Sequence, residues 1–180
     1  MIFPFSGDYP VTRRFGVYDP AYKNYPGSKH PGTDYGLPAN TRLRASISGK
    51  ITVFDRDSSI KTGRGKEVVV TGVDGVQVKC CHMNHIDVRD GQMMRAGDLI
   101  GLSGNTGYVL PRPTPQNPNA GAHLHVEVMY QGQYLDPEKY FNNNIMEAKM
   151  YPNEGDIINY WRAFRKETAS DDAIAHWTTG

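Results

Sequence analysis

The chain has 180 residues with 38% hydrophobic content, and its 20 basic side chains nearly balance its 19 acidic ones. This composition supports one folded domain with an appendage, and without a basic or acidic block it argues against nucleic acid as a partner. No apolar run approaches the ~18 residues of a membrane-spanning helix, so no span is expected.

The first residues of chemical interest are His30 and Asp34, which lie four positions apart. Pro31 and Gly32 between them disfavour a helix. An extended segment also turns residues four apart to one side, so both side chains can face a common site.

Six later segments have the alternating or β-branched pattern of strands, and the breaks between some of them suit hairpin turns. The expected strands are residues 42–47, 50–55, 67–71, 76–82, 98–102 and 123–130. The expected turns are residues 48–49, 73–75 and 131–133. The pattern therefore predicts a series of short strands joined by turns.

The fourth of these segments carries Cys80 and Cys81 and ends at His82. Neighbours in a strand point to opposite faces, so the two cysteines are poorly placed to bond each other and no disulfide is expected. The chain is then made in a reducing compartment, or it needs no bridge. His82 alone would be an ordinary surface residue at a strand end.

The last segment places His123 and His125 on one face of an extended strand. Leu124, Val126 and Val128 fall on the other face, toward the core. The histidines would therefore line a groove.

A catalytic zinc ion needs three nitrogen or oxygen ligands from the protein and an open position for water. His30 and Asp34 can converge with His125 on one such ion. A closed structural zinc site is disfavoured because those sites usually carry several cysteines. His85 and His176 belong to no such pattern and are expected at the surface.

These motifs resemble those of the lysostaphin/LytM-type zinc endopeptidases, which cut peptide bonds in bacterial peptidoglycan. The family pattern is His-x-x-x-Asp, then a strand-end His followed by Leu or Met, then Gly-x-His-x-His. The chain has these motifs at residues 30–34, 82–83 and 121–125, and the resemblance runs from about Phe3 to Leu135.

The resemblance implies that His30, Asp34 and His125 are ligands of one zinc ion per chain, and that His82 and His123 are catalytic. It implies an all-β fold, a small antiparallel β-sandwich of the LytM or duplicated-hybrid-motif type, with a groove across the metal. A zinc-activated water would attack a peptide carbonyl of a stem peptide or cross-bridge, which would lyse the wall. One catalytic histidine would take the proton of the water and the other would donate to the oxyanion or the leaving amine, and which histidine does which is left open.

Two long segments depart from the usual family pattern. Residues 107–121 carry four prolines, and residues 18–29 carry Tyr18, Tyr22 and Tyr25. Both segments either wall the groove or form inert surface loops. Glu127 also has two interpretations: it orients a ligand histidine, or it faces solvent.

The composition changes beyond the β-rich part, and we expect the endopeptidase domain at residues 1–144 and a short α-helical appendage at residues 145–180. Helical spacing of apolar residues predicts one helix at 155–166, and a second is expected at 171–177. The appendage either packs on the sandwich or serves as a wall-binding or oligomerising element.

The start of the chain has no secretory signal pattern, so we expect a phage lysin that is released through a holin or carried on the virion. A secreted bacterial enzyme whose signal has been removed is the alternative. The protein is expected to be a monomer that acts on peptidoglycan. Two other functions compete: a catalytically inactive LytM-like adaptor of another wall hydrolase, and a sugar-transport phosphocarrier, which has paired histidines but no need for His-x-x-x-Asp.

Overall fold

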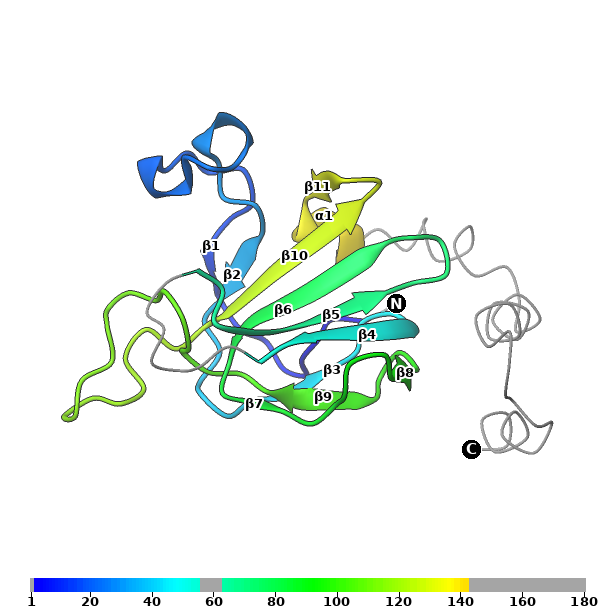
Figure 1. Ribbon diagram of the computed structural model, residues 1–180. Helices are drawn as coiled ribbons and strands as arrows, with labels where there is room; N and C mark the ends of the chain where they lie inside the picture. Colours follow the sequence, from blue (N-terminus) through cyan, green and yellow to red (C-terminus); the bar gives the residue numbers. More distant parts are fainter. Residues whose placement is uncertain (1, 56–62, 143–180) are drawn as a thin grey trace. The chain divides into compact units, whose positions relative to one another are not determined.

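The computed structural model describes residues 2–55 and 63–142 (Figure 1). The predicted appendage, with both of its helices and His176, lies outside the described residues. Within them, short strands dominate, and one α-helix and two 3-10 turns accompany them. The elements are β1 Val11–Arg13, η1 Pro20–Tyr22, η2 Pro26–Ser28, β2 Thr33–Tyr35, β3 Arg42–Arg44, β4 Gly49–Phe54, β5 Lys66–Thr71, β6 Gln77–Met83, β7 His85–Ile86, β8 Met93–Met94, β9 Leu99–Leu102, β10 Leu124–Tyr130, β11 Gln133–Leu135 and α1 Pro137–Asn142.

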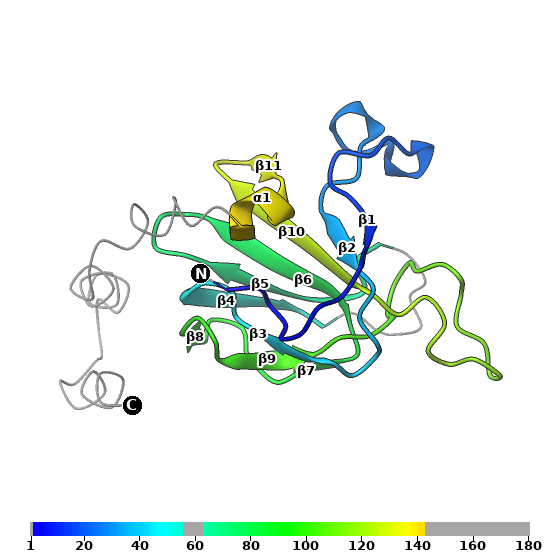
Figure 2. The same ribbon diagram turned by 180° about the vertical axis from the view of Figure 1, so that it is seen from behind.

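The strands form two antiparallel sheets. The larger sheet has the order β1-β2-β10-β6-β5-β4-β8, and β11 also pairs with β10. The smaller sheet has the order β3-β9-β7 and lies beside β4 and β5 in both views (Figures 1 and 2). The predicted all-β, antiparallel fold class is confirmed.

The core follows from the apolar faces of these strands. Leu124, Val126 and Val128 on β10 have no exposed surface, as the alternation in that segment predicts. The smaller sheet contributes Leu43 and Ile100, which are equally buried. Burial of such side chains contributes roughly 1.5–3 kcal/mol each, and it fixes which face of β10 remains for polar groups.

All six predicted strands are present with slightly shifted ends, but the first is shorter than expected. β3 stops at Arg44 because Ala45 is no longer paired in the ladder of β3. The backbone N–H of Ala45 instead donates to the carbonyl of Asp98. Five strands, β1, β2, β7, β8 and β11, were not predicted. Each has only two or three residues, which is too short for a periodic signal.

Two of the three predicted hairpin turns are confirmed. Residues 73–75 join β5 to β6, and Gln131 and Gly132 join β10 to β11 with positive φ at both positions, as in a type I′ turn. The hairpin predicted at residues 48–49 is wrong. Ser48 lies just before β4 and Gly49 begins it, and the preceding strand β3 belongs to the smaller sheet, so no ladder joins β3 to β4.

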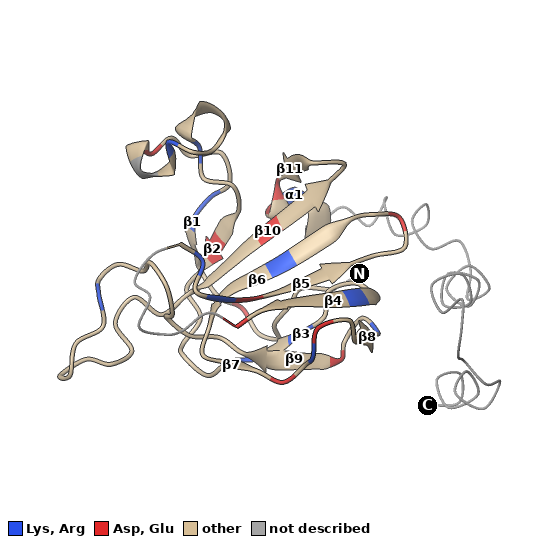
Figure 3. Ribbon diagram, in the orientation of Figure 1, with Lys and Arg blue, Asp and Glu red and all other residues tan. Residues whose placement is uncertain are grey.

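Charges of both signs are interspersed along the strands (Figure 3). No helix in the described residues is long and apolar enough to cross a bilayer. A basic residue on β6 lies beside an acidic one on β10 (Figure 3), and their cross-strand register identifies them as Lys79 and Glu127. This pair lies next to the candidate site.

Candidate metal centre and active site

Three neighbouring strands, β2, β10 and β6, carry most of the candidate site. Asp34 on β2 and His125 on β10 are direct partners in the antiparallel register. Residues opposite each other in such a pair point to the same face and lie close together. Asp34 Oδ1 consequently lies 2.7 Å from His125 Nδ1.

His30 reaches the same point from the residues just before β2. Its Nε2 lies 3.0 Å from His125 Nδ1 and 3.2 Å from Asp34 Oδ1, and its side chain is completely buried. Gly32 makes this close approach possible, because a Cβ atom there would lie 2.1 Å from the carbonyl oxygen of Val126.

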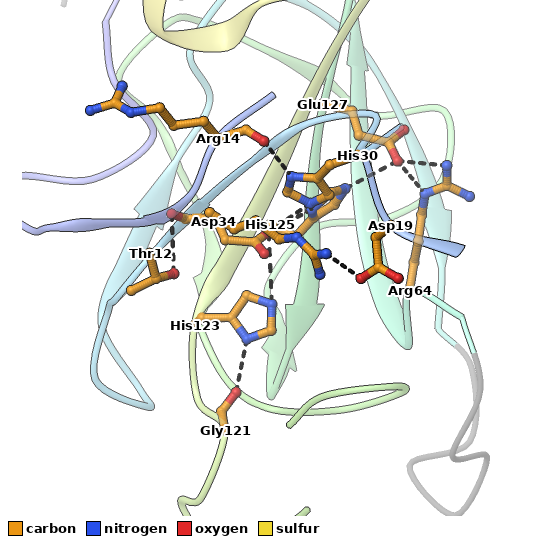
Figure 4. Close-up of polar contacts among 11 residues, drawn as sticks. Thr12, Arg14, Asp19, His30, Asp34, Arg64, Gly121, His123, His125 and Glu127 are labelled. Carbon is orange, nitrogen blue, oxygen red and sulfur yellow. Dashed lines mark hydrogen bonds and ion pairs between the residues drawn. The ribbon is translucent and has the colours of Figure 1, made fainter. Parts of the chain in front are cut away.

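The three groups therefore converge as expected from the sequence. Ligand atoms of His30, Asp34 and His125 all lie within 4.8 Å of one another. The other ring nitrogen of His30 has a partner that sets its tautomer: Nδ1 donates to the carbonyl of Arg14 at 3.0 Å (Figure 4). Two imidazole nitrogens and one carboxylate oxygen are a donor set that fits catalytic zinc.

The electrostatics suit a cation at this point. Burial acts to raise the pKa of Asp34, but hydrogen bonds with His125 and His30 outweigh it and hold that pKa well below its usual range. Asp34 is thus an ionised carboxylate at neutral pH. A fixed negative charge between two imidazoles suits a divalent cation.

An irregular ladder between β5 and β6 positions His82. Lys66 pairs with Met83 and Val68 pairs with Cys80, so one residue of β5 faces two of β6, the second being His82. This is the count of a β-bulge, and His82 adopts a left-handed φ of 61°. A bulge redirects a side chain, and here it turns the imidazole toward the site.

His82 and His123 lie side by side, with ring centroids 4.6 Å apart. His82 Nδ1 donates to the carbonyl of Thr106 and His123 Nδ1 to that of Gly121, each at 2.8 Å. A carbonyl can only accept, so each Nδ1 carries the proton and each Nε2 has a lone pair in the neutral ring. His123 Nε2 lies 3.9 Å from Asp34 Oδ1.

Burial keeps both of these histidines neutral. It lowers the pKa of His82 to about 3, and the charges of His123 and His125 act in the same direction. Burial also lowers the pKa of His123. Two neutral imidazoles beside a carboxylate and two further histidines are suited to proton transfer.

Glu127 is completely buried, so the solvent-facing interpretation is wrong. Its Oε1 lies 3.2 Å from His125 Nε2 and accepts from Arg64 Nε at 2.7 Å (Figure 4). Lys79 Nζ lies 3.2 Å from the other carboxylate oxygen, Oε2. Burial acts to raise the pKa of Glu127, but His125, Arg64 and Lys79 lower it to about 2. The carboxylate holds the Nε2 proton of His125 and leaves Nδ1 directed at Asp34.

Exchange of Glu127 for glutamine is therefore expected to weaken zinc affinity by about 10- to 100-fold, the usual effect of losing such an orienting partner. Competition with a chromophoric chelator measures the affinity. Glu138→Gln, the same chemical change on α1, is the control and should leave affinity unchanged. Equal affinity in both variants would show that the buried carboxylate does not position His125.

A pocket of about 480 Å³ opens onto Asp34, His82 and His123. Tyr22 of η1 forms part of its wall, and its ring packs against His30 with centroids 5.2 Å apart. Residues 108–111 contribute another part. Parts of both long segments therefore wall the site, as one of the two sequence interpretations proposed.

The other two tyrosines of the first segment do not line this pocket. Tyr18 is 67% exposed, and Tyr25 lies against the guanidinium of Arg64 at 5.4 Å from its ring. His85 lies at the surface as expected, 3.1 Å from Asp87. Cys80 and Cys81 are both buried free thiols, and no disulfide between them was predicted.

More than half of the chain matches a known protein family. The model of peptidase family M23 matches residues 28–137, a range that includes the three candidate ligands and the two neutral histidines beside them. The chain belongs to peptidase family M23. The lysostaphin/LytM-type resemblance of the sequence motifs is thereby confirmed.

This M23 domain is similar in sequence to parts of two longer curated relatives. It is 33% identical over 108 residues to the DD-carboxypeptidase/endopeptidase Mpg of Neisseria meningitidis serogroup B, covering 60% of the chain and 22% of the relative. It is 30% identical over 153 residues to the peptidoglycan DD-endopeptidase ShyA of Vibrio cholerae, covering 81% of the chain and 31% of the relative. The chain thus spans about a third or less of the length of these relatives.

The solved catalytic domain of lysostaphin from Staphylococcus simulans has the same fold. The TM-score is 0.59 at 24% identity, and the alignment covers 75% of this chain and 93% of that domain. The overall fold is therefore shared with a known peptidase domain.

Proposed function

We propose that this M23 domain is a zinc-dependent endopeptidase that hydrolyses peptide bonds in the stem peptides or cross-bridges of bacterial peptidoglycan, and so lyses cell walls. The observation that carries the proposal is the convergence of His30, Asp34 and His125 beside two neutral histidines in an open pocket. ShyA is named a peptidoglycan DD-endopeptidase, and this name supports peptide bonds of peptidoglycan as the substrate class; Mpg is named a DD-carboxypeptidase/endopeptidase, which agrees with a peptidase activity.

His30 Nε2, Asp34 Oδ1 and His125 Nδ1 would hold the zinc ion. When bound, zinc supplies a Lewis acid and lowers the pKa of a coordinated water toward ~7. Asp34 supplies the single negative charge of the set. The carbonyl of Arg14 and the carboxylate of Glu127 hold the two ligand imidazoles in orientation.

His82 and His123 carry out the proton transfers. Each ring is fixed through Nδ1 to a backbone carbonyl, so each Nε2 is available without reorientation. One can accept a proton as the attacking water loses it, and the protonated ring can then donate to the oxyanion or to the leaving amine. Their contact, with ring centroids 4.6 Å apart, lets the two act on the same substrate bond.

An inactive adaptor of another wall hydrolase is the alternative, and the complete set of five residues favours the enzyme over it. Mass spectrometry of fragments released from purified peptidoglycan tests the difference. The endopeptidase should release peptides with new amino and carboxyl termini and leave the glycan strands intact. A zinc-loaded protein that releases no fragment from any peptidoglycan type would support the adaptor.

The delivery route stays a prediction. A phage lysin released through a holin or carried on a virion, and a secreted bacterial enzyme, both bring the domain to the wall. The monomeric state also stays a prediction.

A further inference from the structure

One cationic side chain beside the candidate active site has no part in the proposed chemistry. Arg13 of β1 lines the same pocket as Asp34, His82 and His123. Among the described residues that line the pocket, Arg13 and Asp34 are the only ones with a formal charge. Because Asp34 is assigned to the metal, Arg13 is the charge left for a substrate.

The guanidinium of Arg13 is held in place by two contacts. Its Nη2 pairs with the carboxylate of Asp19, and its carbon atom Cζ lies 5.2 Å from the centre of the Tyr22 ring. The same ring packs against His30. A single aromatic ring therefore separates the cation from a predicted metal ligand.

The pairing with Asp19 leaves capacity for a second anion. A guanidinium presents five N–H donors in one plane and stays protonated, so it can bind a carboxylate at each of two edges. The Arg13 side chain is 33% exposed, which makes it accessible from the pocket. With a divalent ion held by one carboxylate, the pocket as a whole would be positive and would favour an anionic substrate.

We infer that Arg13 is a specificity-determining residue that binds a carboxylate of the substrate peptide close to the bond that is cut. The inference rests on the proposed function and names its substrate class: acidic peptides rather than neutral cross-bridges. In a peptidoglycan peptide, such a carboxylate is either the free C-terminus or the side-chain carboxylate of an acidic residue.

Three synthetic peptides of one stem-peptide sequence distinguish these sources. The first has both carboxylates free, the second has its C-terminus amidated, and the third has its side-chain carboxylate amidated. For the wild-type protein, one of the two amides is expected to lower kcat/KM by about 10- to 100-fold, the usual effect of losing a hydrogen bond to a charged group. The amide that does so identifies the carboxylate.

Arg13→Met should cut the acid and the amide at equal rates, while its zinc content stays that of the wild type. Arg13→Lys should restore part of the preference, because lysine keeps the charge but lacks the planar fork. Arg89→Met, the same change at an exposed position between β7 and β8, is the matched control and should keep the full preference.

Asp19→Asn provides a second variant with the opposite expectation. It keeps Arg13 and removes the competing negative charge, so the preference for the acid should be equal to or greater than that of the wild type. A preference that is unchanged in Arg13→Met, or a wild-type protein that cuts all three peptides equally, would overturn the inference and leave the proposed function intact. A wild-type protein that cuts none of them would overturn both.

Discussion

Alanine at His30, Asp34 or His125 is expected to remove most of the bound zinc and to abolish hydrolysis of purified cell walls. Each of these residues supplies one of the three donor atoms that lie within 4.8 Å of one another. Two remaining ligands leave the ion with at least one more position to fill from solvent, so affinity falls steeply. Elemental analysis and turbidity loss of wall suspensions measure the two effects.

The domain should remain folded in these variants, because the apolar face of β10 and the smaller sheet form the core independently of the site. Circular dichroism checks this. His85→Ala, a change at an exposed histidine outside the site, serves as the control and should retain zinc and activity. A ligand variant that still binds stoichiometric zinc would show that the ligand set is wrong.

Alanine at His82 or His123 is expected to separate metal binding from chemistry. Zinc should stay close to stoichiometric in both variants, while cleavage slows by roughly 10²- to 10⁴-fold, the usual range for losing an acid–base group. Neither imidazole belongs to the converging ligand set, and each is held by a backbone carbonyl instead. Zinc content and kcat on a defined peptide are the measurements, and loss of metal from either variant would contradict the assignment.

The candidate site could be predicted from the sequence because its residues lie in short motifs with strict spacing. Alternation alone placed His123 and His125 on one face, and their strand buries Leu124 and Val126 on the other. The register that puts Asp34 opposite His125 depends on which strands are neighbours, so no local pattern could supply it. The resemblance to the family motifs implied that Asp34 and His125 bind the same ion, without giving the register.

The position of His82 had no signal in the strand pattern. Strict alternation in residues 76–82 would turn the side chain of His82 away from the site. A β-bulge at which His82 itself adopts a left-handed φ turns it toward the site instead. A bulge in the middle of a ladder is set by both strands, and one sequence segment does not reveal it.

The charged neighbours of the site were not predicted for a different reason. Arg64 and Lys79 are separated from Glu127 by long stretches of sequence, and solvated lysine and arginine residues are common on strands. Their role follows only from the burial of Glu127, which requires compensating charge.

The helix α1 was also missed, although the sequence carries its signal. Asp136 accepts a hydrogen bond from the backbone N–H of Glu138, and Pro137 occupies the first helical position. Aspartate followed by proline is a typical helix start. The helix is only six residues long, so apolar periodicity could not reinforce that signal.

The dependence of wall hydrolysis on zinc tests the central claim most directly. Purified wild-type protein should contain about one zinc ion per chain, lose hydrolysis on exhaustive chelation, and regain it when zinc is added back. Released peptide termini, counted by mass spectrometry before chelation, after chelation and after zinc addition, give the result. Full hydrolysis by protein shown to be free of metal would contradict the zinc mechanism.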